Sequence, residues 1–274
     1  MGVTIEDIKR LRTMTGAGLS ACKDALAQAD SDFDKAMEII REKGQAIAAK
    51  RSDRSATEGC VLGGTNGKFA ATVALKCETD FVASNADFIK LTQQILDAAL
   101  KEQPADLEAL KNVKIGNDSI AQMVTDRSGI TGEKLELDLY THIEGESVYV
   151  YIHPGNKLVA TVAFNQPNTD SNVMKEVAMQ VAAMNPVAIS PAEVPADSLE
   201  EEKKIAKDKA REAGKPENLL DRIAEGSLNK YYKEYTLLNQ EYTRDTKINM
   251  AQFMDKSSKG LTVTAFKRVT LNAE

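Results

Sequence analysis

The spacing of apolar residues predicts short amphipathic helices at the start of the chain. Ile5, Ile8 and Leu11 recur at helical intervals, and Thr4 with Asp7 forms the capping-box pattern that begins a helix. Two further helices are predicted from one set of apolar positions at Leu19, Cys22, Leu26 and Ala29 and from a second at Phe33, Ala36, Met37 and Ile40. Each set lies roughly on one face, so three helices can enclose a small core.

Turn and capping residues mark the ends of these helices. Gly16–Gly18 separates the first two, Asp32 is a candidate N-cap for the third, and the third is expected to end near Gly44. The charged segment Lys50–Arg54 follows as a linker. The sequence therefore predicts an N-terminal helical module with its linker over residues 1–54.

Beyond this module the pattern changes to the two-residue period of β-strands. Gly63–Gly67 is a hairpin turn signal, and the residues after it alternate at Phe69, Ala71, Val73 and Leu75. Further elements are predicted as a helix over Asn85–Leu100 and as strands over Leu135–Tyr140 and Thr262–Phe266, the last of which can close a second sheet.

The chain also contains an internal repeat. Lys68–Leu75 aligns with Lys157–Phe164, and each run is followed by Thr-Asp, by Ser-Asn and then by a helical pattern. This predicts an α+β fold in which two related hairpin-plus-helix units form a two-part core, with a first subdomain over 55–140 and a second over 141–274.

The two copies differ by an insertion. Phe81–Ala83 stands between Thr-Asp and Ser-Asn in the first copy, whereas the second copy has no such residues. Phe81 also lies outside the apolar stripe that begins at Phe88. We expect a connecting loop that presents Phe81 outward; the alternative is a phenylalanine packed under its own helix.

A charge-rich helical hairpin is predicted as an insertion at about 187–228. Its helices span Leu199–Ala213 and Glu217–Asn229, with Gly214–Pro216 between them. The first helix has few large apolar residues, which leaves two interpretations open. It is either a solvated surface helix or a contact surface for a second copy or another partner.

Composition narrows the class of function. The 35 Lys and Arg residues against 41 Asp and Glu give a net charge of −6, which argues against a phosphate-backbone binder. No apolar run approaches the roughly 20 residues that cross a bilayer. The three cysteines are widely spaced, and His142 and His153 are the two histidines, so no metal site is predicted. We expect a globular protein of a reducing cytoplasm, without cofactor, membrane segment or compact catalytic motif.

Four motifs, taken together, point to a known family. They are Leu11–Leu19 continuing to Cys22–Leu26, then Cys77–Ala83, Tyr151–His153 and Gly214–Pro216. Over nearly its whole length the sequence resembles the elongation factor Ts family, the guanine-nucleotide exchange factors of elongation factor Tu. The resemblance implies that the helical module is ubiquitin-associated-like. Because no organelle-targeting extension precedes the first motif, we expect a bacterial cytoplasm; the alternative is a processed organellar form.

The resemblance also assigns a role to the inserted residues. It implies that Thr79, Asp80, Phe81 and Val82 bind elongation factor Tu, in its GDP-bound and nucleotide-free forms, and dislocate its Mg²⁺. Asp80 and Phe81 would enter the partner near its Mg²⁺ and phosphate site and promote GDP release, so that GTP can bind. Such a factor acts by differential binding and performs no bond chemistry, so an enzyme is not expected.

Four other residues match family positions at the partner interface. Arg12, Leu19 and Ser20 would help the helical module bind the G domain, and His153 would lie at the same interface. From the residues alone, Leu19 is a core residue, Ser20 has no assigned role, and His153 is a turn residue beside Pro154. The helical hairpin is a candidate for homodimer formation.

Several positions depart from the family pattern, among them Ala21, where an acidic residue is frequent. Many members carry Glu and Asn where this chain has Ala74 and Lys76, and Met where it has Ser20. We expect Ala74 and Lys76 to change the local support of the Thr79–Val82 segment, and the small polar Ser20 to weaken the case for a partner contact at its position.

Three rival functions remain open. The basic linker Lys50–Arg54 favours an RNA-binding accessory protein, although the net charge of −6 opposes it. A thiol enzyme would use Cys77 beside Asp80 with a histidine, but no spacing supports it. A scaffold would bind the partner without changing nucleotide release.

Overall fold

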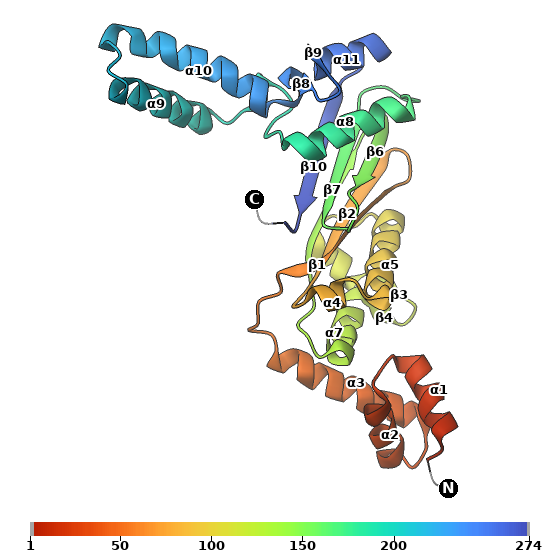
Figure 1. Ribbon diagram of the computed structural model, residues 1–274. Helices are drawn as coiled ribbons and strands as arrows, with labels where there is room; N and C mark the ends of the chain where they lie inside the picture. The colour runs from red at the N-terminus through yellow and green to blue at the C-terminus, as the bar shows by residue number, and fades with distance from the viewer. Residues whose placement is uncertain (1–2, 273–274) are drawn as a thin grey trace. The chain divides into compact units, whose positions relative to one another are not determined.

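The computed structural model describes residues 3–272 and shows an α+β protein, as predicted (Figure 1). The chain forms two compact units. The first contains the chain up to Leu62, then Thr72–Thr141 and the residues from Leu271 on, and the second contains Gly63–Ala71 and His142–Thr270. The predicted boundaries at residues 54 and 140 stay predictions.

The N-terminal helices are α1 (Ile5–Thr15), α2 (Leu19–Gln28) and α3 (Phe33–Lys50). The capping box of Thr4 and the N-cap at Asp32 are confirmed. These helices share a core of fully or nearly fully buried residues, namely Leu11, Ala17, Cys22, Ala25, Leu26, Ala29 and Ala36.

Two details of the helical prediction are wrong. Ile5 is 73% exposed and lies outside the core, although its spacing placed it on the apolar face. Helix α3 does not end near Gly44 but continues to Lys50. Gly44 is instead a buried position inside the helix, where it packs against another helix.

Helix α3 crosses α7 (Ile120–Thr131) at a pair of glycines. A Cβ placed on Gly129 would lie 2.1 Å from the Cα of Gly44, so the two backbones are in direct contact. Arg41 extends from α3 to two carboxylates, with its Nη2 2.9 Å from Asp118 and its Nε 3.6 Å from Asp126. These contacts fix α3 within the first unit.

The first sheet has the strand order β1-β2-β5. Its strands are β1 (Glu58–Thr65), β2 (Phe69–Cys77) and β5 (Glu136–Glu144). Every residue of Phe69–Leu75 is buried, so the central strand is covered on both faces and is not the half-exposed strand that alternation suggests. The elements between β2 and β5 are α4 (Asp80–Ala83), α5 (Ala86–Glu102), α6 (Leu107–Asn112), β3 (Lys114–Ile115), β4 (Asp118–Ser119) and α7.

The second sheet has the order β10-β7-β6 and is antiparallel throughout. Its strands are β6 (Ser147–Ile152), β7 (Leu158–Phe164) and β10 (Val263–Thr270), so the predicted closing strand is confirmed. Helix α8 (Ser171–Met184) packs on this sheet through a core that includes Val162, Phe164, Val177 and Val181. Strand β7, like β2, is buried at every position.

The two sheets share one topology. In each, the second strand of a hairpin is central, a helix follows it, and a strand later in the chain pairs with its free edge. Asn85 is the N-cap of α5 and Asp170 is the N-cap of α8. This correspondence supports the sequence repeat.

The helical hairpin consists of α9 (Ala196–Glu212) and α10 (Leu220–Tyr235), with short 3₁₀ turns at Pro191–Glu193 and Glu217–Leu219 (Figure 1). Its buried residues recur every four positions, at Ala206 and Ala210 and at Leu220, Ala224 and Leu228. Contact of the hairpin with a second copy stays a prediction. The chain then forms a 3₁₀ turn (Leu237–Asn239), β8 (Glu241–Tyr242), β9 (Asp245–Asn249), α11 (Met250–Ser257) and β10.

Candidate functional site

The inserted residues of the first repeat form a single helical turn, α4, which corrects the prediction of a loop. Thr79 is its N-cap, and the Thr79 hydroxyl accepts the backbone N–H of Val82 at 3.4 Å. The backbone N–H of Ser84 donates to the carbonyl of Asp80 at 2.9 Å and closes the turn. An N-cap and one turn are sufficient to give the inserted residues a defined orientation.

Phe81 is exposed at the surface of this turn. Its exposed fraction is 83%, the highest among the large apolar residues of the described chain. Asp80 is also exposed, Val82 is half-buried, and Ala83 is the buried residue of α4. The expected outward position of Phe81 is confirmed, and packing under its own helix is wrong. An aromatic side chain presented in this way is typical of protein-binding surfaces.

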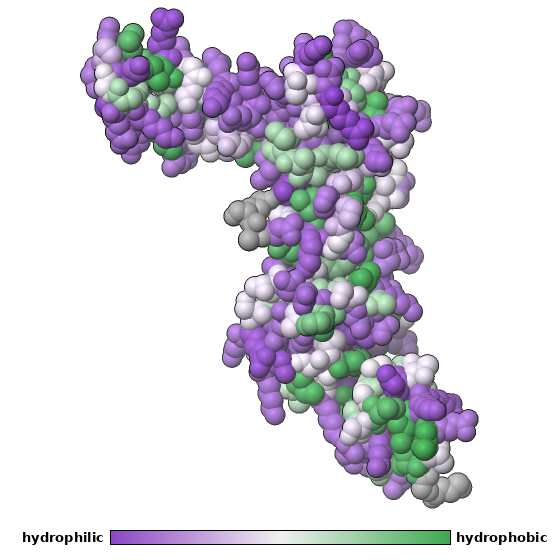
Figure 2. All heavy atoms as spheres, viewed as in Figure 1, coloured by the Kyte–Doolittle hydropathy of each residue, from purple (hydrophilic) through white to green (hydrophobic). Residues whose placement is uncertain are grey.

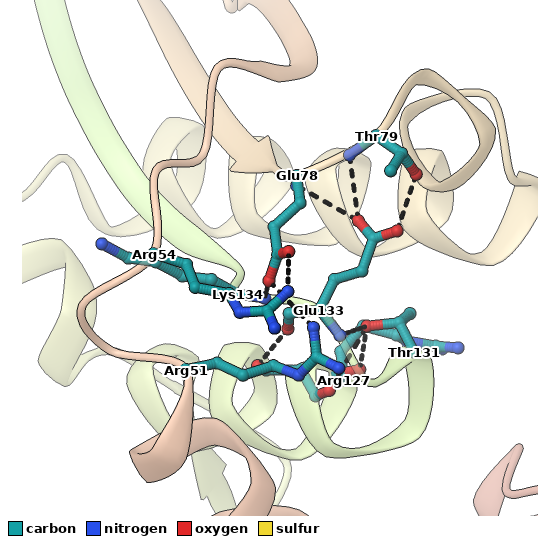
Figure 3. Close-up of polar contacts among 9 residues, drawn as sticks. Arg51, Arg54, Glu78, Thr79, Arg127, Thr131, Glu133 and Lys134 are labelled. Atoms are coloured by element: carbon teal, nitrogen blue, oxygen red, sulfur yellow. Dashed lines mark hydrogen bonds and ion pairs between the residues drawn. The ribbon is translucent and has the colours of Figure 1, made fainter.

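Glu133 holds the base of the turn from the segment that follows α7 (Figure 3). One carboxylate oxygen accepts the backbone N–H groups of Glu78 and Thr79, each at 3.1 Å. The other oxygen accepts the Thr79 hydroxyl at 2.6 Å. The two residues that precede α4 are therefore both bound to one side chain.

Glu78 in turn binds the segment that contains Glu133. Its carboxylate accepts the backbone N–H of Lys134 at 2.6 Å and the guanidinium groups of Arg51 at 3.2 Å and Arg54 at 2.9 Å (Figure 3). The Lys134 N–H, followed by Arg54 and Arg51, holds the pKa of Glu78 below its ordinary value, against the opposing effect of burial. We call the paired segments Glu78–Thr79 and Glu133–Lys134 the glutamate clasp.

The clasp predicts an acid-dependent loss of stability. Because the folded chain favours the ionised form of Glu78, its contribution to stability is present above the unfolded pKa, near 4.5, and disappears as the pH falls through the lower folded value. Urea unfolding between pH 7 and pH 3 should show stability falling more steeply below about pH 4.5 in the native chain than in Glu78→Gln. Parallel pH profiles for the two proteins would contradict this assignment.

The two residues that precede Glu78 also have defined contacts. Lys76, one of the departures from the family pattern, forms an ion pair of 2.7 Å with Asp138. Cys77 is buried, and its thiol donates to the carbonyl of Thr79 at 3.2 Å. A thiol nucleophile needs an accessible thiolate, so this environment opposes the thiol-enzyme interpretation.

The three candidate residues of the helical module are exposed. Arg12 lies near the end of α1, and Leu19 and Ser20 begin α2. Leu19 is 51% exposed, so its interpretation as a core residue is wrong. It lies in the first turn of α2, which directs its side chain away from the core at Cys22. Figure 2 shows apolar residues gathered at the surface of this module, whose exposed large apolar side chains are Ile5, Met14, Leu19 and Ile47.

His153 belongs to the second unit and lies just beyond β6. It is exposed, and its Nδ1 lies 3.0 Å from the hydroxyl of Tyr151. Its backbone N–H donates to the carbonyl of Leu158 at 2.8 Å, which closes the turn into β7. The backbone position of His153 is thus set by the hairpin, while its ring is accessible.

The described residues contain neither of two features common in other functional classes. Across residues 3–272, no group of three or more His, Cys, Asp or Glu side chains is arranged to hold a metal ion. None of the helices in that part of the chain is long and apolar enough to span a membrane. The candidate site consists of the exposed side chains of Phe81 and Asp80 on a turn held by hydrogen bonds. Such a site is typical of a protein that binds another protein.

Comparison with known proteins identifies the family. The family model described as Elongation factor TS matches residues 78–273. Proteins named Elongation factor Ts from Porphyromonas gingivalis and Azobacteroides pseudotrichonymphae are 56% and 48% identical, and each match covers 100% of both chains. A protein of the same name from Bacteroides thetaiotaomicron is 44% identical, also over 100% of both chains. The chain belongs to the elongation factor Ts family.

Proposed function

We propose that this chain is a guanine-nucleotide exchange factor of translation elongation, which binds elongation factor Tu in its GDP form and accelerates GDP release. The observation that carries the proposal is Phe81, 83% exposed on a turn fixed by the glutamate clasp. Membership of the elongation factor Ts family supports the choice of partner. Asp80 and Phe81 would enter the partner near its Mg²⁺ and phosphate site.

The physical basis of exchange is differential binding. Bound Mg²⁺ and charge-assisted hydrogen bonds to the phosphates make GDP release from a GTPase slow. A protein that binds the nucleotide-free conformation more tightly than the GDP form lowers the affinity for GDP, and by linkage GDP lowers the affinity for that protein equally. GTP can then bind the emptied site. No bond is made or broken by this chain.

The remaining candidate residues would enlarge the contact. Arg12, Leu19 and Ser20 are exposed on the helical module and would bind the G domain of the partner. Leu19 adds exposed apolar area to that surface. His153, whose ring is accessible, is proposed as a contact from the second unit.

The test is stopped-flow release of a fluorescent GDP analogue from elongation factor Tu, with and without this chain. We expect release to accelerate with increasing concentration of the chain and to saturate. Binding without acceleration would contradict the exchange function and favour a scaffold. The deciding quantity is therefore the rate of GDP release when elongation factor Tu is saturated with this chain, compared with the rate in its absence.

The RNA-binding alternative loses part of its basis. It depended on the charge of Lys50–Arg54, but Arg51 and Arg54 both form ion pairs with Glu78. Their charges are therefore partly neutralised within the chain. Salt-sensitive retention of RNA by the purified chain in a filter assay would support this alternative.

A further inference from the structure

Helix α4 is too short to be stable without support. It contains four residues, and a helix of that length does not persist in water, because nucleation is unfavourable and few hydrogen bonds repay it. At its C-terminal end, Ala83 is buried, and the backbone N–H of Asn85 donates to the carbonyl of Val82 at 3.0 Å. At its N-terminal end the support comes from Glu133.

The contact with Glu133 also fixes the capping geometry. The Thr79 hydroxyl has one proton, which it donates to Glu133 at 2.6 Å, so its lone pairs are left for the N–H of Val82. Without the acceptor at Glu133 the hydroxyl would be free to rotate. The carboxylate of Glu133 thus orients the cap, and the cap orients the turn that carries Phe81.

Glu133 is itself held in place. It follows the left-handed C-cap of α7 at Gly132, and its backbone N–H donates to the Thr131 hydroxyl at 3.3 Å. The Ser128 hydroxyl donates to the Glu133 carbonyl. The next residue, Lys134, donates its N–H to Glu78 at 2.6 Å. The support therefore extends from α7 to the turn through a continuous set of hydrogen bonds.

We propose that Glu133 is a positioning residue for nucleotide exchange: it preorganises the Thr79–Val82 turn so that Phe81 meets the partner already oriented. The inference rests on the proposed function of that turn. A preorganised turn avoids the entropy of ordering at the moment of binding, which otherwise weakens the complex that promotes exchange. Glu133 acts through Thr79 and does not need to touch the partner.

Glu133→Gln tests this with a minimal change in shape. The carboxylate accepts three hydrogen bonds on two oxygens, whereas an amide has one oxygen and directs an NH₂ group at donors. Either the Thr79 hydroxyl or the two backbone N–H groups must lose their acceptor. Glu146→Gln is the matched control, because it makes the same chemical change at an exposed ion pair with Lys68.

Two measurements on the full-length chain decide the proposal. In the free chain, amide hydrogen exchange over 79–85 should become faster in Glu133→Gln and stay unchanged in Glu146→Gln. In stopped-flow release of the GDP analogue, Glu133→Gln should lower the acceleration by about tenfold. Thermal unfolding of each variant establishes that the rest of the fold is retained.

A double-mutant cycle with Phe81→Ala separates positioning from a general structural effect. If Glu133 acts by orienting Phe81, Glu133→Gln should reduce release further by less than about twofold in the Phe81→Ala chain. A full additional tenfold loss, or unchanged hydrogen exchange in Glu133→Gln, would overturn the proposal. If Phe81→Ala alone leaves release unchanged, the proposed function of the turn fails, and hydrogen exchange still reports whether Glu133 holds the turn.

Discussion

Replacing Phe81 by alanine is expected to lower the acceleration of GDP release on the order of 100-fold. An aromatic anchor that becomes buried at a protein interface contributes roughly 2–4 kcal/mol, and Phe81 is 83% exposed before binding. Most of its side chain is therefore available to be buried by the partner. If that burial is stronger in the nucleotide-free complex, the loss will be seen in the maximum rate of release and not only in the concentration needed to reach it.

The same substitution should leave the free chain intact. An exposed side chain that contacts little of its own protein changes the free energy of unfolding by no more than about 0.5 kcal/mol when it is shortened. Met184→Ala is a suitable control, because Met184 is also an exposed apolar residue, at 42%, but lies at the end of α8. Equal loss in both variants, or full activity in Phe81→Ala, would show that Phe81 has no special role.

The exposed part of the site could be predicted from the sequence, whereas its support could not. Comparison of the two repeats singled out Phe81, because the second copy makes the strand-to-helix transition without it. No repeat, insertion or motif in the sequence identifies Glu133. It lies 54 residues after Thr79 in the chain, in a segment with no distinct pattern, and nothing local shows that its carboxylate will face two backbone N–H groups. Contacts of this kind depend on the tertiary fold.

Strand burial shows a similar limit. The alternating residues Phe69, Ala71, Val73 and Leu75 correctly predicted a strand, but the residues between them are small or apolar and are buried as well. Both central strands, β2 and β7, are covered on two faces. Periodicity identifies the element, but which faces are covered depends on packing against segments distant in sequence.

The clearest error in the predicted helical module concerns the end of α3 at a glycine. Glycine is a common C-cap, so the sequence predicts that the helix ends near Gly44, yet α3 continues for six residues beyond it. Helix α7 was not predicted, since its sequence is rich in threonine, serine and glycine, which are weak helix formers. The two helices meet at Gly44 and Gly129, and the close approach of their backbones leaves no room for a Cβ at Gly129.

This contact leads to a second large expected effect, now on stability. A Cβ on Gly129 would lie 2.1 Å from the Cα of Gly44 and 2.7 Å from its carbonyl carbon, and both are backbone atoms that cannot rotate away. Gly129→Ala must therefore separate α3 from α7, which also strains the contacts of Arg41 with Asp118 and Asp126. Overpacking of this kind typically costs about 1–3 kcal/mol in the free energy of unfolding.

The partner glycine provides the matched control. A Cβ on Gly44 would meet its nearest atom, the Cα of Gly129, at 3.4 Å, which is close to ordinary contact. Alanine also stabilises a helix interior by up to about 1 kcal/mol relative to glycine, so Gly44→Ala should be near neutral or slightly stabilising. Urea denaturation of the two variants measures the difference directly. Equal stability of both would contradict the asymmetric crossing, because the same substitution on either helix would then meet the same resistance.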